Sequence, residues 1–245
     1  MSSAAQLLVI PATPDPLTLD VTRTAVLVID MQNDFGAEGG MFQRAGIDIT
    51  PIQAAVAPTA RVLAAARAVA LPVIYLTMEF RPDLSDAGAP DSPNFLRHRR
   101  FGVGERVTAP DESESRVLVR GTWNTAILDA LTPQAGDIVV AKHRYSGFYQ
   151  TDLDIILKTL EARYLIVTGC TTSVCVESTI RDAMFRDYSC LLLADCTAEP
   201  LGAECSRSNH EASLLTIQAL FGWVSTSTEL LARLPVPRAT GSGTA

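Results

Sequence analysis

The sequence has no long apolar segment. Across 245 residues, 47% of them hydrophobic, the longest uninterrupted apolar runs, such as those at 25–29 and 190–194, contain five residues. A helix that crosses a bilayer needs about 20. The first basic residue, Arg23, also comes too late for the charged start of a secretory signal. We therefore expect a cytoplasmic protein without a membrane partner.

Basic charge and the common cofactor motifs are scarce as well. The chain has 20 Lys and Arg against 27 Asp and Glu, a net charge of −7, which disfavours nucleic acid as a partner. Its three histidines have no metal-ligand spacing, and neither a dinucleotide-binding glycine fingerprint nor a P-loop is present. Five cysteines without a C-x-x-C pair are typical of a reducing compartment. We expect no metal and no cofactor.

Apolar segments that alternate in type are present instead. Five short apolar runs predict strands, those at 25–29 and 72–77 being typical of strands buried in a sheet, and a last strand is expected at 223–225. Longer stretches between them have helical character. This alternation predicts an α/β fold with a mostly parallel, doubly wound sheet. The predicted strands lie at 25–29, 72–77, 137–141, 164–168, 190–194 and 223–225. The predicted helices lie at 51–70, 123–131, 151–160, 176–184 and 208–220.

The segments group into one predicted domain, residues 1–234. It begins with an N-terminal extension at 1–20 and ends before a flexible tail at 235–245, which contains Gly-Ser-Gly. The region 79–120 contains four prolines and is predicted to be irregular. Because loops of this length are often functional, we expect this inserted region to contribute to a site.

Three reactive side chains follow predicted strands. Asp30 ends the first, Lys142 ends the third, and Cys175 lies just beyond the fourth, where a helix begins. Ligands bind at the carboxyl ends of parallel strands, so these residues could converge. A helix start and the Lys142 charge would lower the pKa of a thiol, and Asp30 could exchange its proton. Taken singly, each also fits a structural role: a core cysteine, a capping aspartate, a solvated lysine.

Three blocks of the sequence resemble one known family. Residues 28–35 (VIDMQNDF), Lys142 and residues 169–176 (GCTTSVCV) are similar to the signature blocks of the isochorismatase-like cysteine hydrolases. The resemblance implies a three-layer α/β/α fold with a six-stranded sheet, and Asp30, Lys142 and Cys175 as the catalytic triad. It also implies a cis peptide before Thr171 and an oxyanion hole formed by the Thr171 and Cys175 amides. We further expect a homo-oligomer, a dimer or tetramer.

Other stretches resemble one branch of this family, the ureidoacrylate amidohydrolases of pyrimidine degradation. They lie at 92–95, 120–123, 144–148, 175–179 and 221–225. The resemblance implies a metal-free amidohydrolase that cleaves a ureido or carbamoyl C–N bond through a covalent cysteine intermediate. Residues 81–84 are instead similar to biuret hydrolases, so biuret, triuret or another carbamoyl amide remains an alternative substrate. A catalytically silent binding protein on the same fold is the alternative from another class.

Candidate substrate contacts come from the loops around this expected site. Phe35, Asn94 and Tyr145 are predicted to line or grip a small-molecule substrate, with plain loop packing as an equal alternative for each. Three arginines of the inserted region would favour a substrate with a carboxylate over a neutral one. They are Arg97, Arg99 and Arg100.

Overall fold

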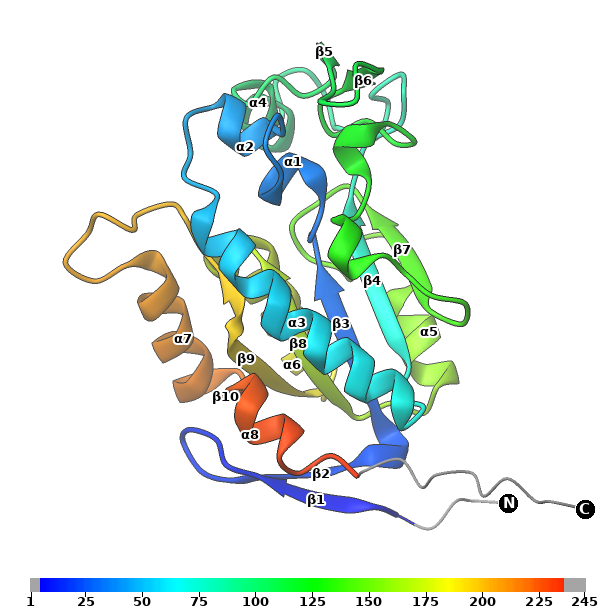
Figure 1. Cartoon of the computed structure of the whole chain (residues 1–245), viewed down its shortest axis with the longest axis vertical. Helices are drawn as coiled ribbons and strands as arrows, with labels where there is room; N and C mark the ends of the chain where they lie inside the picture. Colours follow the sequence, from blue (N-terminus) through cyan, green and yellow to red (C-terminus); the bar gives the residue numbers. More distant parts are fainter. Residues whose placement is uncertain (1–4, 236–245) are drawn as a thin grey trace, which may run out of the picture.

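The computed structural model describes residues 5–235, so residues 236–245 of the predicted tail lie outside it. A six-stranded sheet has the order β10-β9-β8-β3-β4-β7, and each neighbouring pair is parallel (Figure 1). All six predicted strands are present. They are β3 (Thr24–Ile29), β4 (Val73–Met78), β7 (Ile138–Lys142), β8 (Tyr164–Cys170), β9 (Ser189–Ala198) and β10 (Trp223–Ser225).

Helices cover both faces of the sheet, which confirms the predicted three-layer α/β fold. One face packs against α3 (Thr50–Ala68) and α8 (Ser227–Leu231), and the other against α5 (Leu153–Thr159), α6 (Glu177–Met184) and α7 (Asn209–Leu220). Strand β3 shows why its apolar run is continuous. Val26 and Val28 belong to the core on the α3 side, whereas Leu27 and Ile29 belong to the core on the opposite side.

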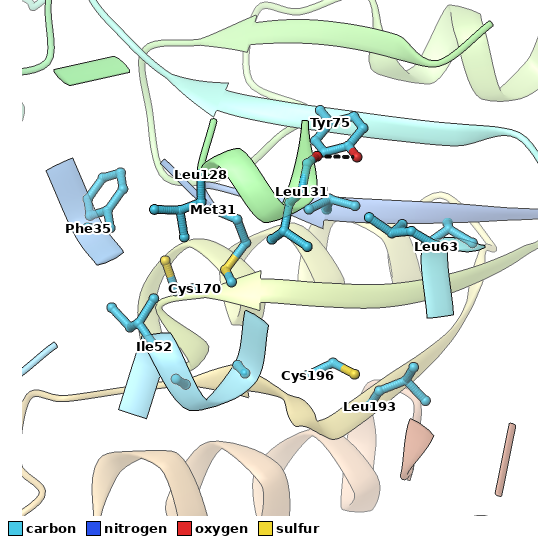
Figure 2. Close-up of a cluster of buried hydrophobic side chains, with 14 of the residues drawn as sticks. Met31, Phe35, Ile52, Leu63, Tyr75, Leu128, Leu131, Cys170, Leu193 and Cys196 are labelled. Atoms are coloured by element: carbon cyan, nitrogen blue, oxygen red, sulfur yellow. Dashed lines mark hydrogen bonds between the residues drawn. The ribbon is translucent and has the colours of Figure 1, made fainter. Parts of the chain in front are cut away.

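The core on the α3 side reaches the edge of the sheet where the predicted site lies. Figure 2 shows Ile52 facing Met31 and Cys170 at one end of this cluster, near Phe35, with Leu63 and Leu131 toward the other end. The buried Tyr75 hydroxyl donates a 2.7 Å hydrogen bond to the Leu131 carbonyl. The loop that follows β3 is thus anchored on packed side chains, which limits its movement.

The strand order reverses between β3 and β8. From β3 the chain moves outward to β4 and β7, and it then returns to place β8, β9 and β10 on the other side of β3. Ile29 is paired with Gly169, so Asp30 lies beside the end of β8. Gly169 has φ of 119°, and a Cβ there would lie 2.0 Å from the Ile29 carbonyl oxygen, so only glycine permits this approach. Such a reversal is the usual ligand position of an open parallel sheet.

The helix predicted at 123–131 is wrong. Two 3₁₀ turns occur there, η2 (Trp123–Thr125) and η3 (Asp129–Leu131). Their peptide groups bind the loop after β3 instead of closing helical hydrogen bonds. The Gln32 side chain donates to the Thr125 carbonyl at 2.9 Å, and the Ala126 carbonyl accepts from the Asn33 amide at 2.9 Å. Contacts from a distant segment therefore overrode the local helical pattern.

The region 79–120 contains more regular structure than predicted. Helix α4 (Pro93–Arg99) begins with Pro93 after an N-cap, Ser92, whose hydroxyl accepts from the Phe95 amide. A short hairpin, β5 (Arg106–Thr108) with β6 (Glu114–Arg116), follows it. The short helices α1 (Asn33–Gly36) and α2 (Met41–Arg44) lie near α4 at the same end of the molecule (Figure 1).

The N-terminal extension forms a second hairpin at the opposite end of the sheet. Strands β1 (Leu7–Ile10) and β2 (Leu17–Asp20) pair antiparallel, and the 3₁₀ turn η1 (Val21–Arg23) leads into β3. The extension therefore closes the end of the core that lies away from the predicted site (Figure 1).

Within residues 5–235, no helix combines the length and apolar character needed to cross a bilayer.

Candidate active site

A buried ion pair lies at the carboxyl end of the sheet. The Lys142 ammonium is 2.7 Å from Asp30 Oδ2, and both side chains are at most 1% exposed. Lys142 ends β7, two strands away from Asp30, and its side chain crosses the end of β4, where Nζ lies 3.7 Å from the Met78 sulfur. Nζ also donates to the Arg144 carbonyl at 3.2 Å. The parallel register thus brings together two residues that are 112 positions apart.

The second carboxylate oxygen of Asp30 is buried and unused. Among the atoms of residues 5–235, Oδ1 has no hydrogen-bond partner. Burial raises the pKa of Asp30, while the charge of Lys142 and the Cys175 thiol lower it. Burial alone would lower the pKa of Lys142, but the Asp30 charge opposes it and the net shift is upward. A carboxylate held by a cation at one oxygen and free at the other can accept a proton at the free oxygen.

The turn between β8 and α6 contains Cys175. It is a π-helical turn, η4 (Thr172–Val176), and it begins directly after a cis peptide between Cys170 and Thr171, as the resemblance implied. The Thr171 carbonyl accepts from the amides of Val174 and Val176 at 3.1 and 3.2 Å. The nucleophile candidate is thus held by backbone hydrogen bonds, 94% buried, at the switch point of the sheet.

The expectation of a lowered thiol pKa is wrong for this structure. Burial and the Asp30 charge raise the pKa of Cys175, and Lys142 offsets only part of this rise. The raised pKa favours the protonated thiol over the thiolate. The sequence placed Cys175 at the start of a helix correctly, but it contains no local signal for how deeply the sulfur is buried.

Two polar residues that hold the loop after β3 were not singled out by the sequence analysis. The Gln32 side chain accepts from the Met78 amide at 2.7 Å and donates to the Met78 carbonyl at 3.1 Å. Asp34 accepts from the amides of Met41 and Leu118 at 2.9 and 2.7 Å. Burial raises the pKa of Asp34 to about 6. The feature of the sequence that could have indicated Gln32 and Asp34 is the run of polar residues directly after a buried strand.

Glu199 and His210 form hydrogen bonds with the turn that contains Cys175. Glu199 is 3% exposed and accepts from both the amide and the hydroxyl of Ser173, at 3.1 and 2.5 Å. His210 Nδ1 lies 2.9 Å from the Thr172 hydroxyl. Both residues belong to segments after β9, far from the signature blocks in sequence, so only the fold identifies them.

A cavity of about 80 Å³ opens beside Cys175. It is lined by Cys175 of η4 and by Thr171, the residue before η4. Two of the three predicted substrate contacts, Phe35 and Tyr145, also line it. Phe35 packs edge to face on Phe42, with ring centroids 5.1 Å apart. Most other lining side chains are apolar. The inserted region adds two polar ones from α4, Arg97 and His98.

Asn94 and two of the three arginines are not among the lining residues. The Asn94 side chain donates to the Ala87 carbonyl at 2.8 Å, so it stabilises the loop before α4. All three arginines are exposed, and of the three Arg97 is the one that lines the cavity. Helical geometry explains the position of Arg99, because residues two apart in a helix point to opposite sides, whereas Arg100 follows the last residue of α4. One positive charge from this region therefore borders the cavity.

Comparisons with known proteins agree with this geometry. The profile of the isochorismatase domain matches residues 24–229. A protein named ureidoacrylate amidohydrolase RutB from Methylobacterium radiotolerans is 40% identical over 235 residues, 96% of this chain and 88% of that protein. One of the same name from Rhizobium rhizogenes is 39% identical, over 93% of this chain and 90% of that protein.

Solved structures show the same relationship. A cysteine hydrolase from Pseudomonas syringae pv. phaseolicola superposes with a TM-score of 0.75 at 31% identity, covering 95% of this chain and 98% of that one. An N-carbamoylsarcosine amidase from Thermoplasma acidophilum gives 0.61 at 26% identity, over 84% and 96%. The fold and these relatives define a hydrolase that acts on C–N amide bonds. The chain belongs to the isochorismatase family, as its sequence blocks predicted.

Proposed function

We propose that the chain is a metal-free cysteine amidohydrolase that cleaves the ureido C–N bond of ureidoacrylate, a step of pyrimidine degradation. The observation behind this proposal is the Asp30 carboxylate. Lys142 holds one of its oxygens at 2.7 Å, and the other is buried without a partner within residues 5–235, in the same site as the Cys175 thiol. About 40% identity to proteins named for this activity supports the choice of reaction.

In the proposed mechanism, Asp30 Oδ1 takes the thiol proton as the Cys175 sulfur attacks the ureido carbonyl carbon. An S–C bond forms, and the negative oxygen is stabilised by the Thr171 and Cys175 amides. Asp30 then protonates the departing nitrogen as the C–N bond breaks. The intermediate is a thiocarbamate, in which the carbonyl carbon is bonded to the Cys175 sulfur and to the remaining ureido nitrogen. Water, giving a proton to Asp30, attacks this carbon and releases the sulfur, which recovers that proton. Lys142 keeps Asp30 charged between these transfers.

No metal ion is needed for the proton transfers of this scheme. The first carboxylate after β4 is also already paired with a cation. Glu79 accepts from Arg120 at 2.6 Å. The nucleophile is instead generated by Asp30, so the proposed enzyme uses side-chain acid–base chemistry alone.

Arg97 supports a substrate with a carboxylate. Its guanidinium borders an otherwise mostly apolar cavity, and it forms no salt bridge with a described residue of the chain. An uncompensated cation at the mouth of an apolar cavity attracts an anion and positions it by charge-assisted hydrogen bonds. Ureidoacrylate is an anion, whereas biuret is neutral. The flat, apolar walls provided by Phe35 and Phe42 suit its planar acrylate.

The proposal is tested by ammonia release from ureidoacrylate, biuret, triuret, N-carbamoylsarcosine and nicotinamide. We expect ureidoacrylate to have the highest kcat/KM. Arg97→Gln should lower that value at least tenfold, the equivalent of about 1.4 kcal/mol, and should affect biuret less. Arg99→Gln is the matched control, since Arg99 belongs to the same helix outside the cavity. Preference for biuret, or equal losses in both variants, would contradict the assignment of ureidoacrylate.

A further inference from the structure

His98 is buried at the wall of the candidate site and has no part in the mechanism above. It lies in α4 and is 6% exposed. Its ring packs edge to face on Phe80, with centroids 5.3 Å apart, and lies 5.5 Å from the Tyr145 ring. Its side chain lines the same cavity as Cys175. A buried imidazole in this position is in reach of whatever occupies the cavity.

The hydrogen bond at one ring nitrogen determines what the other can do. Nδ1 lies 2.8 Å from the Asn94 carbonyl oxygen, which can only accept, so Nδ1 holds a proton. Burial lowers the pKa of His98, and the charges of Lys142 and Arg144 lower it further, against the hydrogen bond to Asn94. The ring is therefore neutral, with a lone pair on Nε2. Among the hydrogen bonds formed by residues 5–235, that of Nδ1 is the one in which the His98 ring takes part.

The cavity otherwise offers few acceptors for a donor. Arg97 can only donate, and the walls that Phe42, Phe101 and Val174 provide are apolar. A ureido group has N–H donors, and leaving one unpaired in a desolvated site costs about 1–3 kcal/mol. Asp30 is engaged in proton transfer in the proposed mechanism. Tyr145 and Thr171 also line the cavity, but their hydroxyls can donate as well as accept. Among the nitrogen and oxygen atoms of the lining side chains, the lone pair of His98 Nε2 is therefore the one acceptor that cannot also donate.

We propose that His98 Nε2 accepts a hydrogen bond from a ureido N–H of the substrate and thereby selects for substrates unsubstituted at that nitrogen. This proposal rests on the proposed function, because it assumes that a ureido or carbamoyl compound occupies the cavity. Arg97 would then bind the carboxylate of the substrate while His98 accepts a hydrogen bond from its ureido group. Two neighbouring residues of α4 would set specificity together, one by charge and one by a lone pair.

A pair of variants separates this role from a structural one. His98→Asn keeps a donor in position for the Asn94 carbonyl but has no atom at the Nε2 position. His98→Phe keeps the aromatic packing on Phe80 and Tyr145 but loses both nitrogens. The preferred ureido substrate is compared with analogues methylated at either ureido nitrogen. We expect the wild type to favour the unmethylated compound at least tenfold in kcat/KM at one nitrogen, and both variants to reduce this preference to under about threefold.

A measurement without turnover complements the kinetics. The chain has only three histidines, so the ¹⁵N imidazole spectrum is simple, and His98→Phe identifies the His98 signals. In Cys175→Ser, saturation with N-carbamoyl-β-alanine should move the His98 Nε2 resonance upfield, with Nδ1 still protonated. The signals of His143, which lies outside the cavity, provide the internal control.

The outcomes distinguish the two proposals. Hydrolysis of ureido compounds with an unchanged methyl preference in both variants, or a stationary His98 Nε2 signal at saturation, overturns the role of His98 and leaves the proposed function standing. If no ureido or carbamoyl compound binds or is hydrolysed, the proposed function fails, and the role of His98 fails with it. A collapsed preference together with an upfield shift supports both.

Discussion

Two Lys–Asp pairs of nearly equal length occupy very different places in this molecule. Lys142 and Asp30 are 2.7 Å apart at the carboxyl end of the sheet, with side chains 0% and 1% exposed. Lys158 and Asp154 are 2.6 Å apart on α5, with side chains 71% and 29% exposed. The chemical groups are the same, and only the surroundings differ.

The surroundings decide what each pair does. Water and salt screen the pair on α5, which contributes at most a few tenths of a kcal/mol. The pair at the sheet edge has lost its hydration, a cost that its mutual attraction must offset. A protein gains little stability from such an arrangement, and an apolar pair would serve the core as well. Its presence beside Cys175 therefore fits the proposed role in proton transfer better than a structural one.

The largest expected effect comes from the thiol that this buried pair faces. Cys175→Ser should reduce kcat by at least about 10³-fold, because a hydroxyl is far harder to ionise than a thiol and Asp30 cannot compensate. The fold should persist, since serine is similar in size. Ammonia release and thermal unfolding measure the two properties. Cys205→Ser, which changes the exposed cysteine, is the control and should leave both unchanged. Retained activity in Cys175→Ser would refute the cysteine mechanism.

The second expected effect compares the two lysines directly. Lys142→Met should lower kcat/KM by about 10² or more and reduce the free energy of unfolding by about 3–5 kcal/mol at pH 8, because Asp30 is left buried without its cation. Lys158→Met should reduce that free energy by at most about 0.5 kcal/mol and leave the rate unchanged. Urea denaturation and steady-state kinetics provide the measurements. Similar losses of stability and of rate in both variants would contradict the conclusion that burial gives the two pairs different roles.

The smallest expected effect is a displacement of the pH profile. Asp30 must be ionised to accept the thiol proton, and burial raises its pKa. The rate should therefore fall, as the pH decreases, at a higher pH than an ordinary aspartate would produce. In Lys142→Met the pKa of Asp30 should rise further, because the cation that lowers it is gone, so the acid limb of the residual activity should move upward. Lys158→Met should keep the wild-type profile. An acid limb that does not move in Lys142→Met contradicts the coupling.

Several parts of the fold were predictable because their signals are local. The run at 25–29 is apolar at every position since both faces of β3 are buried, and apolar runs also located β4, β7, β8 and β9. The edge strand β10 is short and only partly buried, and it has no such run. The region 123–131 failed because its peptide groups serve Gln32 and Asn33, which are distant in sequence. Helix α4 was missed although Ser92 and Pro93 form a recognisable N-cap and first turn.

Some residues of the candidate site could also be predicted from local sequence, and others could not. Asp30, Lys142 and Cys175 could be named because each follows a strand in a recognisable block. Asn94 was named on the same kind of resemblance, yet its side chain binds the Ala87 carbonyl and does not line the cavity. Glu199 was not named, because the turn that it braces lies 26 positions earlier in the chain.

The sequence by itself determined the alternation of strands and helices, the family, and the choice of Asp30, Lys142 and Cys175 as candidate reactive side chains, because these depend on short patterns of residue type. Tertiary structure decided which strand lies beside which, and through the reversal between β3 and β8 it decided which side chains meet. It also decided the protonation of Cys175 and the contrast between Arg97 and Arg99. How deeply a group is buried and where its side chain points are properties of the packed molecule. Both depend on every segment that surrounds the group rather than on its neighbours in the chain.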